Sequence, residues 1–339
     1  MQSVGTSPGV LKMSVPLVAV ITPTYNGAKY LAETMESVQQ QTWPNLVHVV
    51  LDNNSRDETP EIVRRCSNGR IPVVYFRNDT VLSQRDNWNK AFSLAPAEAV
   101  YVRLLCDDDT IYPQSIEKMV QLAETDPGIG VVGSRDDGHL RDFRWPESRQ
   151  IFDGPQALAK ALLGEGVIMP IQMMWRKEVV DQRQPLFDDY IEGGAFDMDT
   201  VFDLLTRSKF GFIHETLGFT RAHPNSVSNM VYGEKTHSNT RDHFDLFLKY
   251  GPSALGPDYN EQLSRFRRIY VRQILVWWRK DRRAVQLESH FRALERAGWP
   301  FGVSLVADAI TDWFLRKIHI RSYSSAFTPP QAVRNPLPR

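Results

Sequence analysis

The chain has 339 residues, of which 42% are hydrophobic and 24% charged, and its formal net charge is zero. This composition is that of a folded protein and excludes a disordered or collagen-like chain, while the length permits two domains or one domain with a large extension. The longest apolar run near the start covers residues 15–21, far short of the roughly 18 residues of a membrane span. Cys66 and Cys106 match no disulfide or metal spacing, so we expect a soluble protein in a reducing, cytoplasmic compartment.

Apolar runs alternate with helical patterns through the first 125 residues. Strands are predicted at residues 15–22, 47–51, 73–76 and 100–105, and helices at 30–38, 60–66, 87–94 and 113–124. This alternation predicts a doubly wound, mostly parallel α/β sheet. Ligands bind such sheets beyond the carboxyl ends of the strands, so a site is expected at residues 24–26, 52–57 and 107–109.

The pattern weakens after residue 134. The charged stretch 135–149 around Trp145 predicts a surface excursion, and helices are expected at 156–163, 198–207, 263–278 and 284–297. Residues 263–321 hold thirteen Lys or Arg against five Asp or Glu, so this part is basic. The chain therefore divides into a flexible N-terminus (1–13), an α/β domain (14–230), a helical basic extension (231–325) and a disordered tail (326–339).

Three consecutive carboxylates, Asp107, Asp108 and Asp109, directly follow a predicted buried strand. A hard divalent cation would neutralise them well, because Mg²⁺ and Mn²⁺ prefer oxygen ligands and bridge carboxylates to phosphates. The alternative is an acidic cap for the next helix. Asp52 also ends a strand, and we expect it near the triplet, either as an acceptor for a base or ribose or as a helix cap.

Several segments together resemble the family-2 glycosyltransferases. They are Pro23-Thr24-Tyr25-Asn26, residues 51–59 and residues 104–109, in that order and spacing, and the likeness continues through 87–91 to 196–199 and 221–223. The resemblance covers roughly residues 16–230. It implies the GT-A fold of nucleotide-diphospho-sugar transferases, and an inverting transfer of one sugar to an acceptor hydroxyl in bacterial surface polysaccharide or glycoconjugate synthesis.

The resemblance also implies roles for individual residues. Donor contacts are expected from Pro23, Thr24, Tyr25, Asn26, Asp52, Arg85, Asn87, Asp107 and Arg221, and a divalent metal, Mn²⁺ or Mg²⁺, on Asp108, Asp109 and His223. Cys106 stands where the first aspartate of the DxD motif is usual, so Asp107 is expected to serve in its place. Each of three residues also has a structural alternative. Arg85 could be a solvated surface arginine, Arg221 could form a structural ion pair, and His223 could be a structural histidine.

The second acidic motif of the family falls at Phe196-Asp197. Asp197 is therefore the expected general base, since a carboxylate within hydrogen-bond reach can remove the proton of an attacking sugar hydroxyl. The alternatives are that Asp197 only caps the helix beginning at Met198, or that Asp199 is the base.

The expected partners are a nucleotide-diphosphate sugar, first a UDP-sugar with GDP- or dTDP-sugars as alternatives, and a sugar or lipid-linked acceptor, with no nucleic acid. Trp145 either lines an acceptor site or anchors a loop. The basic extension with Trp277, Trp278 and Trp313 either contacts the inner face of the plasma membrane or packs on the catalytic domain. A non-catalytic sugar-nucleotide binding protein is the alternative function.

Overall fold

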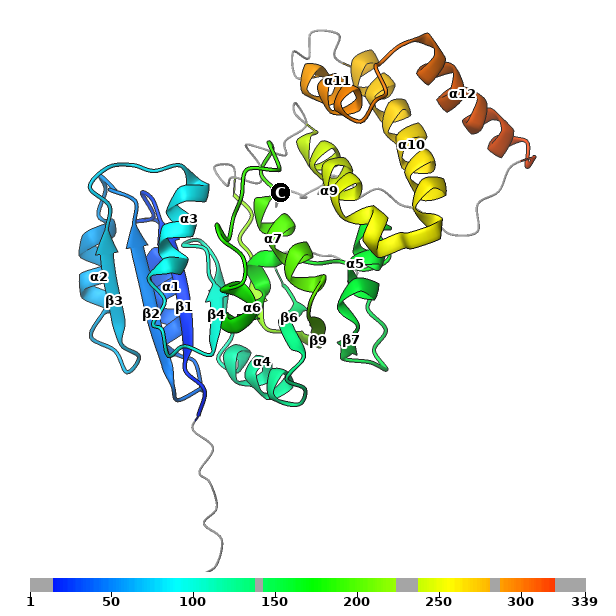
Figure 1. The fold of residues 1–339 in the computed structure, drawn as a ribbon. Helices are drawn as coiled ribbons and strands as arrows, with labels where there is room; N and C mark the ends of the chain where they lie inside the picture. Colours follow the sequence, from blue (N-terminus) through cyan, green and yellow to red (C-terminus); the bar gives the residue numbers. More distant parts are fainter. Residues whose placement is uncertain (1–14, 138–142, 224–236, 281–286, 321–339) are drawn as a thin grey trace, which may run out of the picture.

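A computed structural model describes residues 15–137, 143–223, 237–280 and 287–320. Its central sheet has eight strands in the order β3-β2-β1-β4-β8-β6-β9-β7 (Figure 1). The predicted flexible N-terminus and disordered tail lie outside the described residues.

The first half of the sheet follows the predicted alternation. Its parallel strands are β1 (Val18–Thr24), β2 (Leu46–Asp52), β3 (Val73–Arg77) and β4 (Tyr101–Leu104), connected by α1 (Leu31–Gln39), α2 (Thr59–Cys66) and α3 (Gln84–Ser93). All residues of β1 and β2 are buried, as expected for strands covered on both faces. The register pairs Thr24 with Asp52, which brings the carboxyl ends of these two strands side by side.

The second half of the sheet is mixed. β8 (Met174–Arg176) runs antiparallel to β4 and to β6 (Ile129–Arg135), while β6 pairs in parallel with β9 (Lys209–Thr216), and β7 (Ile151–Phe152) closes the edge antiparallel to β9. The predicted mostly parallel α/β sheet is therefore confirmed, with β8 as an antiparallel strand inside it.

Alternate residues of β1 pack on opposite faces of the sheet. Val18 and Val20 belong to a core with α1 and α4 (Ser115–Glu124), whereas Ala19 and Ile21 pack with α3 on the other face. That second core continues through α5 (Gly154–Leu162) and α7 (Phe196–Leu205) into the C-terminal helices. Within the described residues, the short helices are α6 (Lys177–Val180) and the 3₁₀ turns Pro170–Gln172 and Gly256–Asp258.

The stretch around Trp145 has no regular secondary structure over residues 143–150, and residues 146–150 are exposed, as expected for a surface excursion. The Trp145 indole is buried against Phe152, with ring centroids 4.9 Å apart, and its Nε1 donates a hydrogen bond to the carbonyl of Val167 at 2.9 Å. Trp145 therefore anchors its segment to the core and is not available to line an acceptor site, because aromatic burial outweighed the surrounding charges.

A two-stranded antiparallel ribbon lies outside the main sheet. It pairs β5 (Thr110–Ile111) with β10 (Gly218–Phe219), joining segments more than 100 residues apart in the sequence. This pairing returns the chain after residue 219 to the loop that carries the acidic triplet.

The C-terminal extension is helical, as predicted. It comprises α9 (Ser238–Leu255), α10 (Tyr259–Lys280), α11 (Leu287–Arg296) and α12 (Val303–Lys317), which lie together beyond α5 and α7 (Figure 1). Phe244 and Phe247 of α9 and Phe266 of α10 are buried in the core shared with the α/β domain. Packing on the α/β domain therefore explains the apolar side chains of α9 and α10. None of the helices in the described part of the chain is long and apolar enough to cross a bilayer.

Candidate active site

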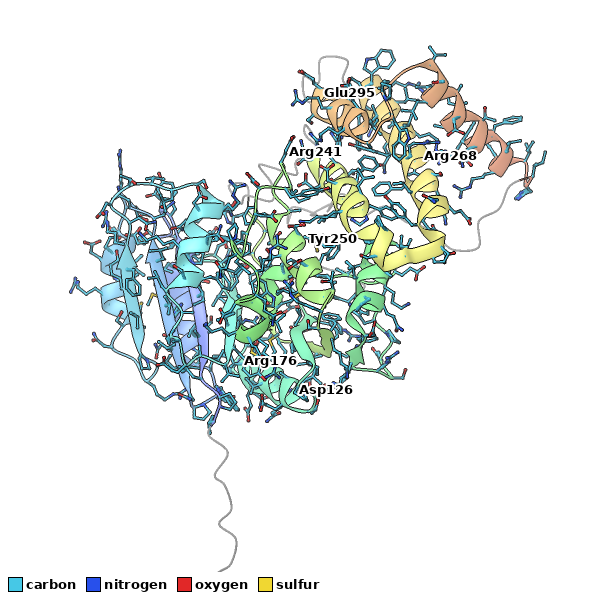
Figure 2. The ribbon with its side chains drawn as sticks, viewed as in Figure 1. Asp126, Arg176, Arg241, Tyr250, Arg268 and Glu295 are labelled. Carbon is cyan, nitrogen blue, oxygen red and sulfur yellow. The ribbon has the colours of Figure 1, made fainter. Side chains whose placement is uncertain are left out.

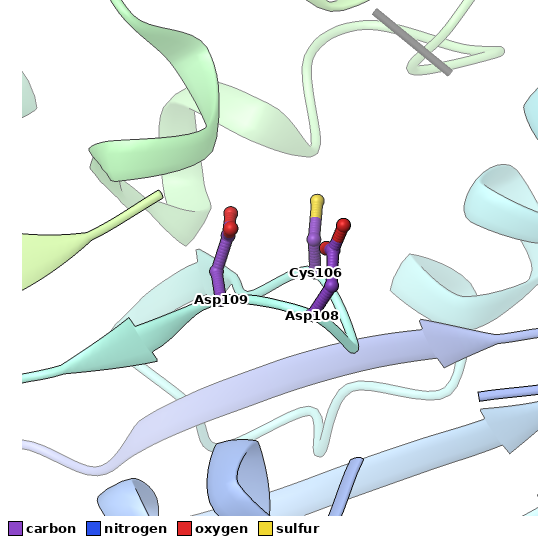
Figure 3. Close-up of side chains that lie close together, drawn as sticks. All are labelled: Cys106, Asp108 and Asp109. Atoms are coloured by element: carbon purple, nitrogen blue, oxygen red, sulfur yellow. The ribbon is translucent and has the colours of Figure 1, made fainter. Parts of the chain in front are cut away.

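The acidic triplet lies in the loop between β4 and β5, beyond the carboxyl end of β4. The side chains of Cys106, Asp108 and Asp109 project to the same side of this loop (Figure 3). The Cys106 sulfur and one carboxylate oxygen from each aspartate lie within 4.8 Å of one another. The cluster is thus small enough for its members to share one cation.

Asp107 joins this loop to the end of β1. Its Oδ2 accepts a hydrogen bond from Thr24 Oγ1 at 2.5 Å. A β-carbon at Gly27 would overlap both Thr24 Oγ1 and the Asp107 carboxylate, so the chain needs glycine at this close approach. Burial, with a smaller contribution from the charge of Asp108, raises the pKa of Asp107 to about 6.

The segment after β10 closes on the triplet. The Arg221 backbone N–H donates to Asp109 Oδ1 at 2.9 Å, and Arg221 Nε donates to the carbonyl of Asp108 at 2.9 Å. His223 Nε2 lies 2.8 Å from Asp108 Oδ2. The Arg221 guanidinium also stacks over the Tyr30 ring, 4.5 Å from its centroid. The structure thus brings Arg221 and His223 together with the aspartates, and their donor and metal roles stay predictions.

A buried cation, Arg103, lies near the triplet. Its side chain is fully buried in β4, its Nη2 donates to Gln172 Oε1 at 3.1 Å, and it attracts the charge of Asp109. Burial lowers the pKa of Arg103 to about 10, which leaves it charged at neutral pH. We did not predict this residue. An arginine inside the apolar run 100–105 was the signal, because buried charges need a partner.

The cluster fits a hard divalent cation through its oxygen atoms. Asp108 and Asp109 offer carboxylates, and His223 lies against Asp108. Cys106 fits poorly, because burial holds the pKa of its thiol well above the usual range and Asp109 and Asp108 raise it further. Only a thiolate is an effective metal ligand. The donor set therefore suits Mg²⁺ or Mn²⁺ on the two aspartates, without the sulfur.

Asp52 is fully buried at the end of β2. Its Oδ1 accepts from the Ser55 backbone N–H and its Oδ2 from the Tyr75 hydroxyl, both at 2.8 Å, and Arg77 Nη1 lies 3.7 Å from Oδ2. The expected capping contact is therefore present. The role of Asp52 toward a base or ribose stays a prediction.

The other predicted donor residues at the end of β1 border the same region. Pro23 is buried, whereas Tyr25 is exposed at the rim. Asn26 adopts a left-handed backbone with φ 53°, donates its N–H to Ser55 Oγ at 2.8 Å and accepts from the Arg56 backbone N–H at 2.9 Å. Asn26 therefore fastens the loop after β1 to the loop after β2.

Arg85 and Asn87 lie on the first turn of α3, and their described contacts are to residues outside the triplet. Asn87 is buried and accepts from Asn78 Nδ2 at 2.9 Å, and Asn78 also donates to Asn53 Oδ1 at 2.9 Å. Arg85 is partly exposed, with Nε 4.0 Å from Asp86. Asn87 thus belongs to an amide network beneath the loops, and both donor assignments stay predictions.

Asp197 is partly buried in the first turn of α7. Its Oδ1 accepts from the Met198 backbone N–H at 2.7 Å. Burial, with a smaller contribution from the charge of Asp242, raises the pKa of Asp197 to about 6. Asp197 also raises the pKa of the Cys106 thiol, so the start of α7 borders the acidic loop. Asp197 therefore lies within electrostatic range of Cys106 but is not part of the cluster that Cys106, Asp108 and Asp109 form.

Asp199 is fully buried in a charge network of its own. Its carboxylate accepts from Arg183 Nη2 at 2.5 Å, from Lys249 Nζ at 2.7 Å and from the Tyr250 hydroxyl at 2.9 Å. Lys249 and Tyr250 belong to α9, and Tyr250 is labelled in Figure 2. Asp199 therefore connects α7 to the extension, which makes it unsuited to act as the base.

This architecture, an α/β sheet with an acidic loop beyond a central strand and a second carboxylate at the start of a later helix, defines a GT-A class protein. A sequence profile for glycosyl transferase family 2 matches residues 19–184. An uncharacterized glycosyltransferase of Rickettsia typhi is 30% identical over 230 residues, which covers 65% of this chain and 68% of that protein. The chain therefore belongs to glycosyl transferase family 2.

Other relatives align over shorter parts. The GalNAc(5)-diNAcBac-PP-undecaprenol beta-1,3-glucosyltransferase of Campylobacter jejuni is 31% identical over 109 residues, 32% of this chain and 35% of that protein. An uncharacterized glycosyltransferase of Methanocaldococcus jannaschii is 30% identical over 36% of this chain and 42% of its own length. The chain thus spans less than half the length of these two relatives.

Solved structures share the fold. TarS 1–349 of S. aureus in complex with UDP has a TM-score of 0.53 at 15% identity, covering 91% of this chain and 93% of that one. A mannosyltransferase from Pyrobaculum calidifontis in complex with GDP-Man and Mn²⁺ has a TM-score of 0.56 at 16% identity, covering 90% and 81%. Likeness at these identities establishes the GT-A fold alone.

Proposed function

We propose that this chain transfers a single sugar from a nucleotide-diphosphate sugar to an acceptor hydroxyl, with inversion at the anomeric carbon. The observation that carries the proposal is the placement of Asp197, whose pKa is about 6, beside the cluster of Asp108 and Asp109. Asp108 and Asp109 are suited to hold a cation, which in turn would hold the donor diphosphate. Asp197, which is separate from them, is suited to accept a proton.

Asp197 is the proposed general base. A carboxylate with a pKa near 6 is mostly ionised at neutral pH, yet it is more basic than an ordinary aspartate. It accepts the proton of the acceptor hydroxyl while that oxygen attacks the anomeric carbon. A single displacement on the face opposite the diphosphate inverts the configuration.

Asp108 and Asp109 are the proposed metal-holding residues. A bound Mn²⁺ or Mg²⁺ would offset the negative charge that develops on the leaving diphosphate. Arg221 and His223 lie against the same two aspartates and present a guanidinium and an imidazole to the same region. We assign them to the diphosphate side of the site, with Thr24, Tyr25, Asn26 and Asp107 toward the nucleoside.

The names of the relatives support the substrate classes. TarS structures carry UDP or UDP-GlcNAc and the P. calidifontis enzyme carries GDP-Man, which favours a UDP-sugar first and a GDP-sugar second. The C. jejuni relative is named for an undecaprenol-diphosphate acceptor, and a Bacillus subtilis relative for teichuronic acid biosynthesis. We therefore propose a sugar or lipid-linked acceptor, in surface polysaccharide synthesis at the inner face of the plasma membrane.

Thermal unfolding with UDP, GDP or dTDP, each with Mn²⁺ or with chelator, tests donor binding. A ligand at about 100 times its dissociation constant adds roughly 2.7 kcal/mol to the free energy of unfolding. We expect a rise in Tm with one nucleotide that needs the metal and is lost in Asp108→Asn. A rise that is equal with chelator would contradict the proposed metal site.

Cys106, in place of an aspartate, favours one second candidate, a non-catalytic sugar-nucleotide binding protein. The two functions separate in a transfer assay with matched donor and acceptor. Product formation that is lost in Asp197→Asn while donor binding persists supports the enzyme. Donor binding without release of nucleotide diphosphate supports the binding protein.

A further inference from the structure

Helix α12 carries four large apolar side chains on the outside of the molecule. Val303, Ile310 and Phe314 are 88%, 49% and 54% exposed, and Trp313 beside them is 49% exposed. Val303, Ile310 and Phe314 are separated by seven and four residues, so they form one stripe along the helix. We call these four residues the outer face of α12.

The opposite side of α12 packs on α10 through charges. Asp308 accepts from Arg267 at 2.8 Å and from Arg268 at 3.0 Å, and Asp312 accepts from Arg272 at 3.1 Å. The Asp312 side chain is 1% exposed. Arg268 is labelled between the two helices in Figure 2. Leu305 and Ala309 complete this inner side.

This arrangement is the reverse of an ordinary surface helix, which buries its apolar face and exposes its charges. Rotating α12 to hide Phe314 would separate Asp308 and Asp312 from three arginines. Because buried charges without partners are costly, the ion pairs specify the outward direction of the apolar face. Contiguous exposed apolar side chains on a soluble domain mark an interaction surface.

The charges around the outer face indicate what binds it. The outer face of α12 carries no acid, because Asp308, whose side chain is 34% exposed, lies on the inner side with Arg267 and Arg268. The most exposed residues of the helix are Val303, Ser304, Ala307, Ile310, Thr311, Trp313, Phe314 and Lys317. Lys317 Nζ lies 5.0 Å from the centroid of the Trp313 ring. Aromatic and aliphatic side chains next to Lys, on a helix face without acids, are typical of helices that lie in the interface of an anionic bilayer.

We propose that α12 lies flat on an anionic lipid surface, with the outer face inserted among the acyl chains and Lys317 at the headgroups. The helix has 15 residues, so it would contact about 22 Å of the surface. This inference rests on the proposed function in one respect, since a membrane-bound helix would bring the enzyme to a lipid-linked acceptor.

Cosedimentation of the full chain with vesicles tests the proposal without donor or acceptor. We expect binding to phosphatidylcholine vesicles that contain phosphatidylglycerol, weaker binding in high salt, and little binding to phosphatidylcholine alone. The double variant Ile310→Ser, Phe314→Ser should lower the partition coefficient at least tenfold. Val81→Ser is the matched control, because Val81 is 48% exposed on the α/β domain, before α3. Thermal unfolding should show that all variants fold.

Three results would overturn the proposal. The first is equal binding, or no binding, by the wild type and the double variant. The second is self-association of the wild type in sedimentation velocity that the double variant abolishes, which would assign the outer face to a second copy. The third is vesicle binding that begins only after residues 321–339 are removed. None of these results depends on glycosyl transfer, so a failure of the membrane proposal would leave the proposed function intact. A chain that binds vesicles but transfers no sugar would instead refute the proposed function and leave the membrane proposal intact.

Discussion

The carboxylate of Asp242 in α9 accepts a hydrogen bond from the backbone N–H of Gly194 at 2.9 Å, and a second from Ala195 at 3.3 Å. A β-carbon at Gly193 would overlap the same carboxylate, so the loop and α9 fit only with glycine there. Ala195 is the N-cap of α7, whose first turn carries Asp197. A residue of the C-terminal extension therefore holds the backbone from which the proposed base projects.

Replacing Asp242 should change the pH dependence of catalysis. The negative charge of Asp242 adds to the burial that raises the pKa of Asp197. Asp242→Asn keeps an oxygen that can accept from Gly194 but removes the charge, so the pKa of Asp197 should fall. We expect the acidic limb of the kcat profile to move to lower pH, measured with saturating donor and acceptor.

The matched control is Asp245→Asn, one turn further along α9. Burial also raises the pKa of Asp245 to about 6, but this residue pairs with Arg296 rather than with the loop before α7. Its substitution should leave the acidic limb in place. An identical shift in both variants would show a general effect of charge on α9 and not a positioning role for Asp242.

The wild-type enzyme should lose activity as the pH falls through about 6. Burial raises the pKa of Asp197 to this value, and only the deprotonated carboxylate can accept a proton. Between pH 7 and pH 5 the deprotonated fraction falls about tenfold, and kcat should fall with it. The charge of Asp242 also raises the pKa of Asp197. The profile should be recorded under conditions where the chemical step limits the rate. A flat profile would contradict the assignment of the base.

Asp197→Asn should abolish transfer while sparing donor binding. Loss of a general base costs about 10²- to 10⁴-fold in rate, and the amide cannot accept the proton at neutral pH. Asp203→Asn is the control on the same helix, because Asp203 pairs with Arg207 and Arg183 near the other end of α7. Product formation and nucleotide affinity are measured separately. Equal activity of the two variants would exclude Asp197 as the base.

Cys106 should contribute little to metal binding. Burial and the neighbouring carboxylates keep its thiol protonated, and hard cations prefer oxygen. Titration of activity with Mn²⁺ should give a half-saturating concentration within about twofold of the wild type for Cys106→Ser and more than about tenfold higher for Asp108→Asn. The reverse order would make the sulfur a ligand.

Arg183→Met should destabilise the fold. Arg183 pairs with Asp199, whose side chain is completely buried, so its removal leaves a buried carboxylate with only Lys249 and Tyr250. We expect the free energy of unfolding in urea to fall by about 3 kcal/mol. Arg207→Met, which breaks only an exposed pair with Asp203, should cost less than about 1 kcal/mol. Similar losses would show that the buried network adds no stability.

Local patterns in the sequence determined the first four strands and the position of the acidic loop. A strand buried on both faces must be a short apolar run, and the polar residues that follow it must lie at the edge of the sheet. Asp107, Asp108 and Asp109 could therefore be placed beyond β4, and Asp52 at the same edge of the sheet, before any contact was known. The helices α9 and α12 were not predicted, because Arg, Asp and His occupy their inward faces and obscure the apolar period.

Only the tertiary structure decided what surrounds these residues. The pairing of β5 with β10 places Arg221 and His223 against Asp108 and Asp109, across more than 100 residues of sequence. The contact of Asp242 with Gly194 makes the extension part of the support for Asp197. Such long-range contacts depend on how whole elements dock, and no local periodicity encodes them. The direction of α12 has the same origin, since its apolar face points outward only because arginines of α10 bind Asp308 and Asp312.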